Sequence, residues 1–339
     1  MNKLLIILLL LSKQALSQNL ELKNIETNID ASFRGLSVVD DSVVWVSGSN
    51  GYVGKSTNGS HTWVFSQIKG FEKNDFRSIY AFNAKTAVIA NAGSPAYILR
   101  TTDSGQNWTV VYTNKDSAAF FDGIDFWNNK EGMIYGDPIR HRMLLLRTHD
   151  GGQHWSELPK ASCPELEQGE SSFAASGTGI RCLKKNKIAI TTGGKESRFF
   201  LSDDKGKTWT FVRSPINKGK ASTGIFSFGC IDDTTFIVVG GDYKNETFSK
   251  DNVYLLYRNI DHFTWKVVFT PTRGYRECVE YLGKKKLVAV GPTGVDISYN
   301  GGLHWKPFSE EKGLHVIRKS RKGKLIIAAG AKGKICVLE

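Results

Sequence analysis

Charged side chains recur at one position of a repeated pattern, close to the start of strand-like apolar runs. Arg34, Arg77, Asp122 and Arg276 each follow an aromatic residue that opens such a run. A guanidinium group donates two parallel hydrogen bonds to a carboxylate, so these arginines could bind an anion while an aspartate holds them in place. We group with them four charged residues from turns expected beside these positions: Asp137, Glu170, Asp242 and Arg273.

Carboxylates in the same set could instead perform hydrolysis of a glycan. Other than sialidases, glycosidases use two carboxylates about 5–10 Å apart across the scissile bond. Asp122, Glu170 and Asp242 are the candidates. The sequence does not fix the distances between them, so a glycan-active hydrolase stays open as the alternative to a non-catalytic binding protein.

A sialidase would need an arginine clamp and a tyrosine nucleophile paired with glutamate. Arg34, Arg77 and Arg276 could imitate the clamp, and Tyr275 with Glu277 could imitate the pair. Successive side chains of a strand point to opposite faces. If Arg276 points into a central channel, we therefore expect its two neighbours to point away from it.

Other chemistries find no support in the sequence. No Gly-x-Gly-x-x-Gly lies between a strand and a helix, so no nucleotide cofactor is predicted. The seven histidines are spread over separate turns and strands, and no metal site is predicted. Five cysteines at wide spacing predict buried free thiols, although a bridge between Cys163 and Cys182 stays open.

The elements that would position these side chains are marked by a repeated turn with the pattern Ser/Thr-x-Asp/Asn-x-Gly-x-x-Trp. An aspartate or asparagine in a turn bonds the backbone beyond it, and glycine supplies a positive φ. The tryptophan would be buried between neighbouring units. This pattern resembles the Asp-box of sialidases and other β-propellers. Its five copies place the third and last residues at Asn58 and Trp63, Asp103 and Trp108, Asp150 and Trp155, Asp204 and Trp209, and Asn300 and Trp305. The first copy has Ser60 where the others carry glycine.

The spacing of these turns predicts a repeat architecture. With a worn copy that ends at Trp265, the tryptophans recur at intervals of 45, 47, 54, 56 and 40 residues. Short strand-like runs with turn signals about every ten residues lie between them. We therefore predict an all-β, seven-bladed β-propeller forming one domain. Its approximate blades are residues 30–68, 69–113, 114–160, 161–214, 215–270, 271–309 and 310–339, the last completed by residues 20–25.

Closure by this N-terminal strand would remove exposed strand edges. The first strand of each blade should begin at Phe33, Phe76, Phe121, Phe173, Gly224, Tyr275 and Leu314. These strands would line the central channel, so the charged residues near their starts would gather at one channel mouth. The repeated turns would lie on the opposite face. Ala174 and Ile225 occupy the charged position in blades four and five, and His315 occupies it in blade seven.

The first residues predict an export signal. Met1-Asn2-Lys3 is followed by an apolar run over residues 4–11 and by Ala15-Leu16-Ser17, which predicts cleavage after Ser17. The run is too short to span a bilayer, and no transmembrane segment is predicted. We expect a periplasmic or extracellular protein, and a monomer.

The net charge of +12 favours a protein or an acidic polymer as the partner and allows peripheral contact with a membrane. The sequence contains no motif that reads nucleic acid, so no nucleic-acid partner is predicted.

Several motifs resemble exported bacterial propellers related to the photosystem II assembly and stability factor. They are Ser32-Phe33-Arg34-Gly35-Leu36-Ser37, Phe120-Phe121-Asp122-Gly123, Gly136-Asp137-Pro138, Ser171-Ser172-Phe173-Ala174, Gly240-Gly241-Asp242-Tyr243, Gly274-Tyr275-Arg276 and Gly291-Pro292. The resemblance spans essentially the whole chain after the leader. It implies the propeller fold and, by analogy, a binding role in assembly without catalysis.

Overall fold

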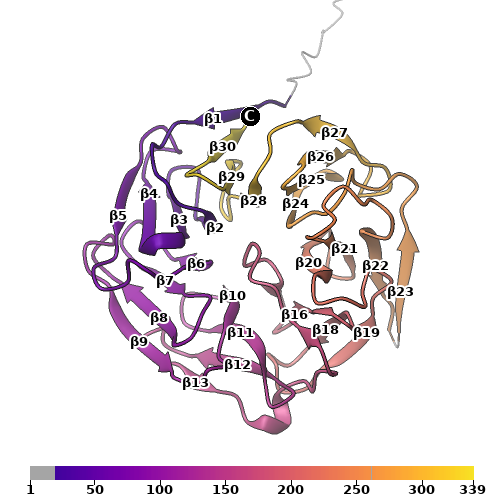
Figure 1. Ribbon diagram of the computed structural model, residues 1–339, viewed down its shortest axis with the longest axis horizontal. Helices are drawn as coiled ribbons and strands as arrows, with labels where there is room; N and C mark the ends of the chain where they lie inside the picture. The colour runs from indigo at the N-terminus through magenta and orange to yellow at the C-terminus, as the bar shows by residue number, and fades with distance from the viewer. Residues whose placement is uncertain (1–19, 261) are drawn as a thin grey trace, which may run out of the picture.

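The computed structural model describes residues 20–260 and 262–339, and within these residues seven β-sheets stand as wedges around one axis (Figure 1). The predicted all-β, seven-bladed propeller is confirmed. The predicted leader, residues 1–17, lies outside the described residues. Among the described residues, no helix is long and apolar enough to span a membrane.

Each blade has four antiparallel strands, given in order from the axis outward, and two further short strands extend the sheet of blade five to six. Blades one to three comprise β2 (Phe33–Val38), β3 (Val44–Gly48), β4 (Tyr52–Ser56) and β5 (Val64–Gln67); β6 (Ser78–Ala81), β7 (Ala87–Ala90), β8 (Ala96–Thr101) and β9 (Thr109–Asn114); and β10 (Phe121–Phe126), β11 (Gly132–Ile139), β12 (Arg142–Thr148) and β13 (Ser156–Glu157).

Blades four to six comprise β15 (Ile180–Cys182), β16 (Ile188–Thr191), β18 (Arg198–Ser202) and β19 (Thr210–Arg213); β20 (Thr223–Cys230), β21 (Thr235–Asp242), β22 (Val253–Arg258) and β23 (Phe263–Val267); and β24 (Cys278–Gly283), β25 (Lys286–Gly291), β26 (Gly294–Ser298) and β27 (Lys306–Ser309). Blade seven comprises β28 (Leu314–Lys319), β29 (Ile326–Gly330), β30 (Ile335–Leu338) and β1 (Leu22–Ile25).

The core lies between the blades. The middle strands carry apolar residues on both faces, as in β3, which is buried along its whole length. Val46 of blade one joins the cluster of Ile327 and Ile335 from blade seven, so each blade buries its faces against its neighbours. The burial of apolar surface between wedges is the main favourable term holding the ring together.

The first and last strands of the chain close the ring. Strand β1 pairs antiparallel with β30, with Leu22 opposite Leu338 and Ile25 opposite Ile335, and the two lie side by side in Figure 1. The prediction that an N-terminal strand completes the last blade is therefore confirmed.

The repeated turns share one hydrogen-bond pattern. In the turn of blade two, the Thr101 hydroxyl donates to Asp103 Oδ1 at 2.9 Å, which also accepts from the Asn107 backbone N–H at 2.9 Å. The blade-four turn repeats this, and its Gly206 has a φ of +82° and lies directly against Met133 of blade three. The turns therefore fix both a hairpin and the contact to the preceding blade.

Blade four departs from the predicted strand positions. Its inner strand is β15, which begins at Ile180 rather than at Phe173. Residues 172–179 form a loop, here called the channel loop, that enters the centre of the ring (Figure 1). The short strands β14 (Glu170–Ser171) and β17 (Gly193–Gly194) flank it and pair toward β20 of blade five.

Candidate functional site

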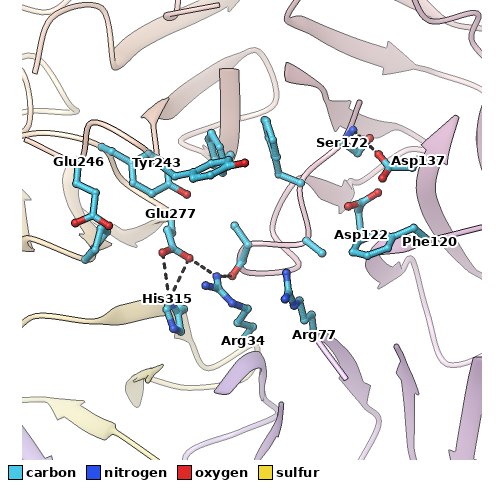
Figure 2. Close-up of a pocket in the computed structure, with 16 residues that line it drawn as sticks. Arg34, Arg77, Phe120, Asp122, Asp137, Ser172, Tyr243, Glu246, Glu277 and His315 are labelled. Atoms are coloured by element: carbon cyan, nitrogen blue, oxygen red, sulfur yellow. Dashed lines mark hydrogen bonds and ion pairs between the residues drawn. The ribbon is translucent and has the colours of Figure 1, made fainter. Parts of the chain in front are cut away.

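A cavity of about 450 Å³ lies at one mouth of the channel. The starts of the inner strands and the turns between second and third strands build its walls, and the channel loop contributes Ser172, Phe173, Ala174 and Ala175 (Figure 2). This is the mouth at which the sequence places the charged positions.

β-Bulges bring the side chains of several inner strands into this cavity. The strand pairing shifts by one residue at Arg34, at Asp122, at Phe226 and at His315, and all four residues line the cavity. A bulge leaves one residue unpaired and changes the direction of its side chain. At Gly123, which follows the bulge in β10, an added Cβ would lie 2.6 Å from the Tyr135 ring, so this close approach needs glycine.

An ion-pair cluster occupies one wall. The Glu277 carboxylate accepts from the Arg34 guanidinium, and His315 Nδ1 lies 3.1 Å from Glu277 Oε2 (Figure 2). Burial by itself would raise the pKa of Glu277, but the charges of Arg34 and His315 outweigh it and hold this pKa below its usual range. Glu277 is therefore a fixed carboxylate, and its charge satisfies Arg34.

The opposite wall carries two neighbouring carboxyl groups, Asp122 and Asp137 (Figure 2). Asp122 is 0% exposed, and among the described residues neither of its oxygens has a hydrogen-bond partner. Burial and the nearby Asp137 raise the pKa of Asp122 well above its usual range, although Arg77 opposes the shift. Asp137 Oδ1 accepts from the Ser172 backbone N–H at 3.0 Å and so helps to hold the channel loop.

The channel loop forms the floor of the cavity. Arg34 donates to the Ala175 carbonyl at 2.7 Å, and the Ser176 hydroxyl donates to the Glu277 carbonyl at 3.0 Å. The Thr178 hydroxyl donates to Ser227 Oγ at 2.6 Å. Contacts with blades one, five and six thus hold the loop across the channel.

An aromatic wall completes the cavity beside this floor. Phe173 stacks on Phe226 with ring centroids 3.9 Å apart, and Tyr275 meets Phe226 edge to face at 4.6 Å. Tyr243 packs edge-on against Phe173 and is 43% exposed. Such rings give a large apolar contact area, with polar groups available at the tyrosines.

Four of the eight predicted site residues line this cavity: Arg34, Arg77, Asp122 and Asp137. Arg77 is held by Asp75, with Nε 2.7 Å from Oδ2, and its side chain is 34% exposed. Figure 2 shows the Arg77 side chain directed toward the middle of the cavity. These placements support a binding role, which itself stays a prediction.

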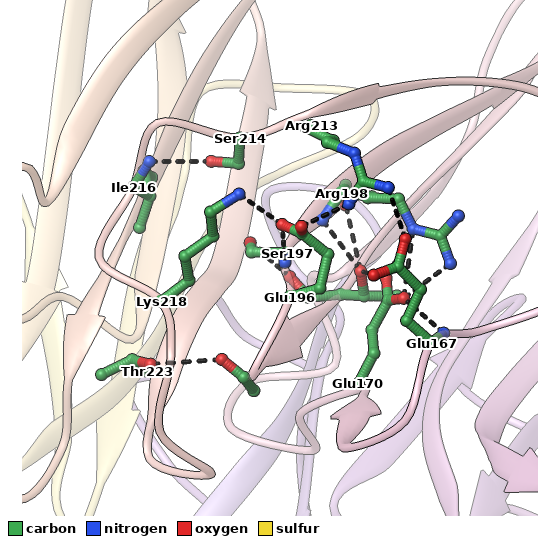
Figure 3. A network of polar contacts seen from close by, with 12 residues as sticks. Glu167, Glu170, Glu196, Ser197, Arg198, Arg213, Ser214, Ile216, Lys218 and Thr223 are labelled. Atoms are coloured by element: carbon green, nitrogen blue, oxygen red, sulfur yellow. Dashed lines mark hydrogen bonds and ion pairs between the residues drawn. The ribbon is translucent and has the colours of Figure 1, made fainter.

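Glu170 does not line the cavity, contrary to the expectation. Its carboxylate is buried and accepts from Arg198, with Nε at 2.9 Å from Oε1 and Nη2 at 2.6 Å from Oε2 (Figure 3). This pair belongs to a network with Glu167, Glu196 and Arg213 beneath the blade-four loops, where it holds strand β14 to β18.

The placement of Arg276, Arg273 and Asp242 at the mouth was also wrong. Arg276 is 0% exposed and donates to Asp296, which also accepts from Arg273 Nε at 2.9 Å. These residues join two segments of blade six. Asp242 lies 3.7 Å from the Lys220 ammonium and accepts from the Lys244 backbone N–H, outside the cavity lining.

Sequence reasoning misplaced two residues that do line the cavity. Tyr275 and Glu277 were expected to point away from the channel, yet both line the cavity while Arg276 points into the blade. The alternation itself held, but the starting assumption that Arg276 faces the channel did not. Phe173 and Tyr243 also line the cavity, but they are uncharged, and only charged residues were selected from the sequence as site candidates.

Within residues 20–260 and 262–339, no group of three histidine, cysteine, aspartate or glutamate side chains is arranged to hold a metal ion. All five cysteines lie in this part of the chain and are free thiols, so Cys163 and Cys182 are not bridged. The chemistry that the cavity offers is hydrogen bonding, ion pairing and aromatic packing.

Seven four-stranded wedges with a lined mouth define the class: a seven-bladed β-propeller. Residues 13–116 match the profile of a family described as photosynthesis system II assembly factor YCF48. A resemblance to this family is therefore confirmed over residues 13–116, and the exported bacterial branch stays a prediction.

Solved structures agree with this fold. YCF48 from Cyanidioschyzon merolae superposes with a TM-score of 0.67 at 16% identity, covering 94% of this chain and 98% of that one. YCF48 bound to D1 peptide gives 0.64 at 15% identity, covering 94% and 96%. The WD40 β-propeller domain of Doa1 gives 0.63 at 12% identity, covering 95% and 97%. None of the curated proteins compared with this chain matches it.

Proposed function

We propose that this protein is an exported, non-catalytic propeller that binds a segment of a polypeptide partner in the mouth cavity and acts as an assembly factor. The observation that carries the proposal is the cavity itself, which combines an aromatic wall with the directed guanidinium of Arg77. A similar propeller, YCF48, has been solved with a D1 peptide bound, which supports a polypeptide as the kind of partner.

The arrangement favours a peptide over a purely anionic polymer. Arg34 is paired with the buried Glu277, and Arg276 is fully buried against Asp296. Arg77 pairs with Asp75 through Nε and is the most exposed of the three, so its terminal nitrogens can reach a partner carboxylate. Phe173, Tyr243 and their neighbours would pack against apolar side chains of the partner. A partner segment that presents one acidic side chain beside an apolar one fits this combination.

Photo-crosslinking in the native host tests this proposal. A photoreactive residue in place of Tyr243, at the cavity, should capture a defined polypeptide. The matched control places it at Phe211, which is 49% exposed on the outer strand of blade four. When Arg77→Ala is combined with the photoreactive residue at position 243, capture should weaken about 10- to 100-fold, which is the contribution of a charge-assisted hydrogen bond. The melting temperature should not change. Equal capture from both positions would refute the cavity as the binding site.

A glycan-active hydrolase is the alternative function. One observation favours it, because Tyr275 and Glu277, the residues that could imitate a sialidase nucleophile pair, both line the cavity. Against it, Arg276 is absent from the cavity, and so are Glu170 and Asp242, two of the three carboxylates predicted for other glycosidases. Hydrolysis of any member of a glycan panel by the wild type, abolished by Glu277→Gln or Asp122→Asn, would replace the binding proposal.

Export and oligomeric state belong to the same proposal. N-terminal sequencing of the protein isolated from its host should begin at Gln18 if the leader is removed after Ser17. Light scattering of the purified protein should give the mass of one chain. An uncleaved N-terminus or a stable dimer would contradict the corresponding part of the proposal.

A further inference from the structure

A second cavity, of about 290 Å³, lies at the other end of the inner strands. All seven inner strands contribute to it through their C-terminal ends, including Asp125 of β10, Arg181 of β15, Glu280 of β24 and Arg318 of β28. This is the channel mouth on the face of the repeated turns. The proposed polypeptide site does not include it.

The charges that line this second cavity do not balance. Its cationic side chains are Arg181, Arg318, Lys319 and Arg321, and its carboxyl side chains are Asp125 and Glu280. Four cations against two carboxyl groups leave an excess of two positive charges in a partly enclosed space. Unpaired charge in such a place is costly, and a bound anion would offset that cost.

Three of the cations are held in place by the protein. Arg181 donates to the Phe228 carbonyl at 2.7 Å and to Glu280 Oε2 at 2.8 Å. Arg321 lies over the Tyr80 ring, 4.4 Å from its centroid, and donates to Ser37 Oγ at 3.0 Å. Lys319 donates to the Leu282 carbonyl at 3.0 Å.

Arg318 differs from these three. Its side chain is 18% exposed and makes no hydrogen bond to any residue that the structure describes; the nearest carboxylate oxygen, Glu280 Oε2, lies 3.9 Å from Nη1. That oxygen already accepts from Arg181. Burial and the neighbouring Arg181 charge lower the pKa of Arg318, although Glu280 opposes the shift. The Arg318 guanidinium therefore shares Glu280 with Arg181 through a long ion pair, and its N–H donors have no acceptor within hydrogen-bond distance among the described residues.

We propose that this cavity binds a small dianionic oxyanion, phosphate or sulfate, with Arg318 as its principal donor. The excess of two charges matches a dianion, and a guanidinium group presents paired N–H donors to two oxygens of such an ion. Lys319, Arg321 and Arg181 would complete the positive surroundings. Apolar walls from Leu36, Ile79 and Phe126 restrict the space to a small ion.

Titration calorimetry of the full chain with inorganic phosphate, and separately with sulfate, tests this proposal at constant ionic strength set by sodium chloride. We expect saturable binding to one site by the wild type. Arg318→Gln should weaken it about 10- to 100-fold, the value of a hydrogen bond to a charged group. The control Arg77→Gln alters the other mouth and should bind phosphate as the wild type does.

Thermal melting adds a readout that a merely structural arginine would not give. In buffer free of phosphate and sulfate, Arg318→Gln should melt no lower than the wild type, because the single long ion pair with Glu280 does little to offset the burial of the Arg318 charge. On adding phosphate, only the wild type and Arg77→Gln should gain stability. Should Arg318→Gln fail to fold, Arg321→Gln takes its place with the same expectation for binding.

Two results would overturn the proposal. One is a wild type that phosphate and sulfate stabilise no more than chloride does at equal ionic strength. The other is an equal response of wild type and Arg318→Gln. Neither result bears on the polypeptide site, which Arg77 and the crosslinker at Tyr243 test separately.

Discussion

Replacing Asp122 by asparagine should stabilise this protein at neutral pH. The Asp122 side chain is fully buried, and both carboxyl oxygens lack hydrogen-bond partners among the described residues. The wild-type protein therefore either carries an unpaired charge or must bind a proton there. Asparagine has nearly the same shape and removes this cost.

Asparagine finds no more hydrogen-bond partners than aspartate does, so the expected gain is only the cost of keeping a proton on Asp122 at pH 7, about 1.4 kcal/mol for every tenfold loss of acidity that folding imposes on this carboxyl group. We expect the free energy of unfolding of Asp122→Asn to rise by about this amount at pH 7. The melting temperature should rise by at most about 2–4 °C for each kcal/mol. The same residue lines the proposed polypeptide site, where proteins commonly sacrifice stability for function.

The wild type should also show a characteristic pH dependence. A carboxyl group whose pKa is raised on folding binds more protons in the folded state, so the free energy of unfolding falls as pH rises above about 4. Asp122→Asn should reduce this slope. Some slope should persist, because burial also raises the pKa of Asp137. Denaturant titrations between pH 4 and 8 would measure both effects.

The matched control is Asp125→Asn, three residues further along the same strand. Asp125 Oδ1 accepts from the Phe126 backbone N–H at 2.9 Å, and Oδ2 accepts from the Cys182 backbone N–H at 2.7 Å. An amide nitrogen cannot accept, so this variant leaves one buried N–H unpaired and should lose about 1–3 kcal/mol. If Asp122→Asn were destabilised like Asp125→Asn, the view of Asp122 as an unpaired carboxyl group would be refuted.

Two buried glutamates and the five cysteines can be tested in the same way. Glu170→Gln should lower the free energy of unfolding by about 3–5 kcal/mol in denaturant titrations, because it leaves the buried Arg198 without its counter-charge, while crosslinking at the cavity is unchanged. Glu277→Gln should weaken the acid dependence of thermal melting. The depressed pKa of Glu277, maintained against burial by Arg34 and His315, contributes stability that is present above about pH 4.3 and is lost as pH falls. The cysteine thiols should resist a disulfide reagent in the folded protein, and five should react after unfolding; fewer than five would reveal a disulfide.

The fold could be predicted from the sequence because its determinant is local and repeated. Each turn such as that of Asp204 satisfies its own backbone, and its tryptophan marks the same place in every copy. The repeat period then gives the number of blades. The strand at residues 20–25 supplies the fourth strand that the last blade would otherwise lack. None of these steps depends on contacts between residues that are far apart in the sequence and carry no repeated pattern.

The candidate site could be predicted only in part because strand alternation is interrupted. Asp122 and Asp125 should point to opposite faces, yet both line cavities at opposite ends of the channel because the bulge at Asp122 shifts the alternation by one. The glycine after the bulge residue, in Phe33-Arg34-Gly35 and Phe121-Asp122-Gly123, was a usable signal for two of the four bulges at the cavity. Phe226 and His315 form bulges without a following glycine, so this signal alone could not have found them.

Blade four misled the prediction for a different reason. Phe173 resembles the aromatic that opens the other inner strands, but it belongs to the channel loop. The interval of 54 residues between Trp155 and Trp209, against 45 and 47 before it, reflects the added segment. Sequence alone could indicate an insertion, but not that it would enter the channel, because that depends on contacts with blades one, five and six.

The pairing of β1 with β30 has a consequence for how this protein is made. Residues 22–25 are synthesised more than 300 residues before their partners at 335–338. Six blades can assemble while translation continues, but the seventh must wait until residues 335–338 have been made. Until then an open sheet edge is exposed, and a chain that stops a few residues early keeps it permanently.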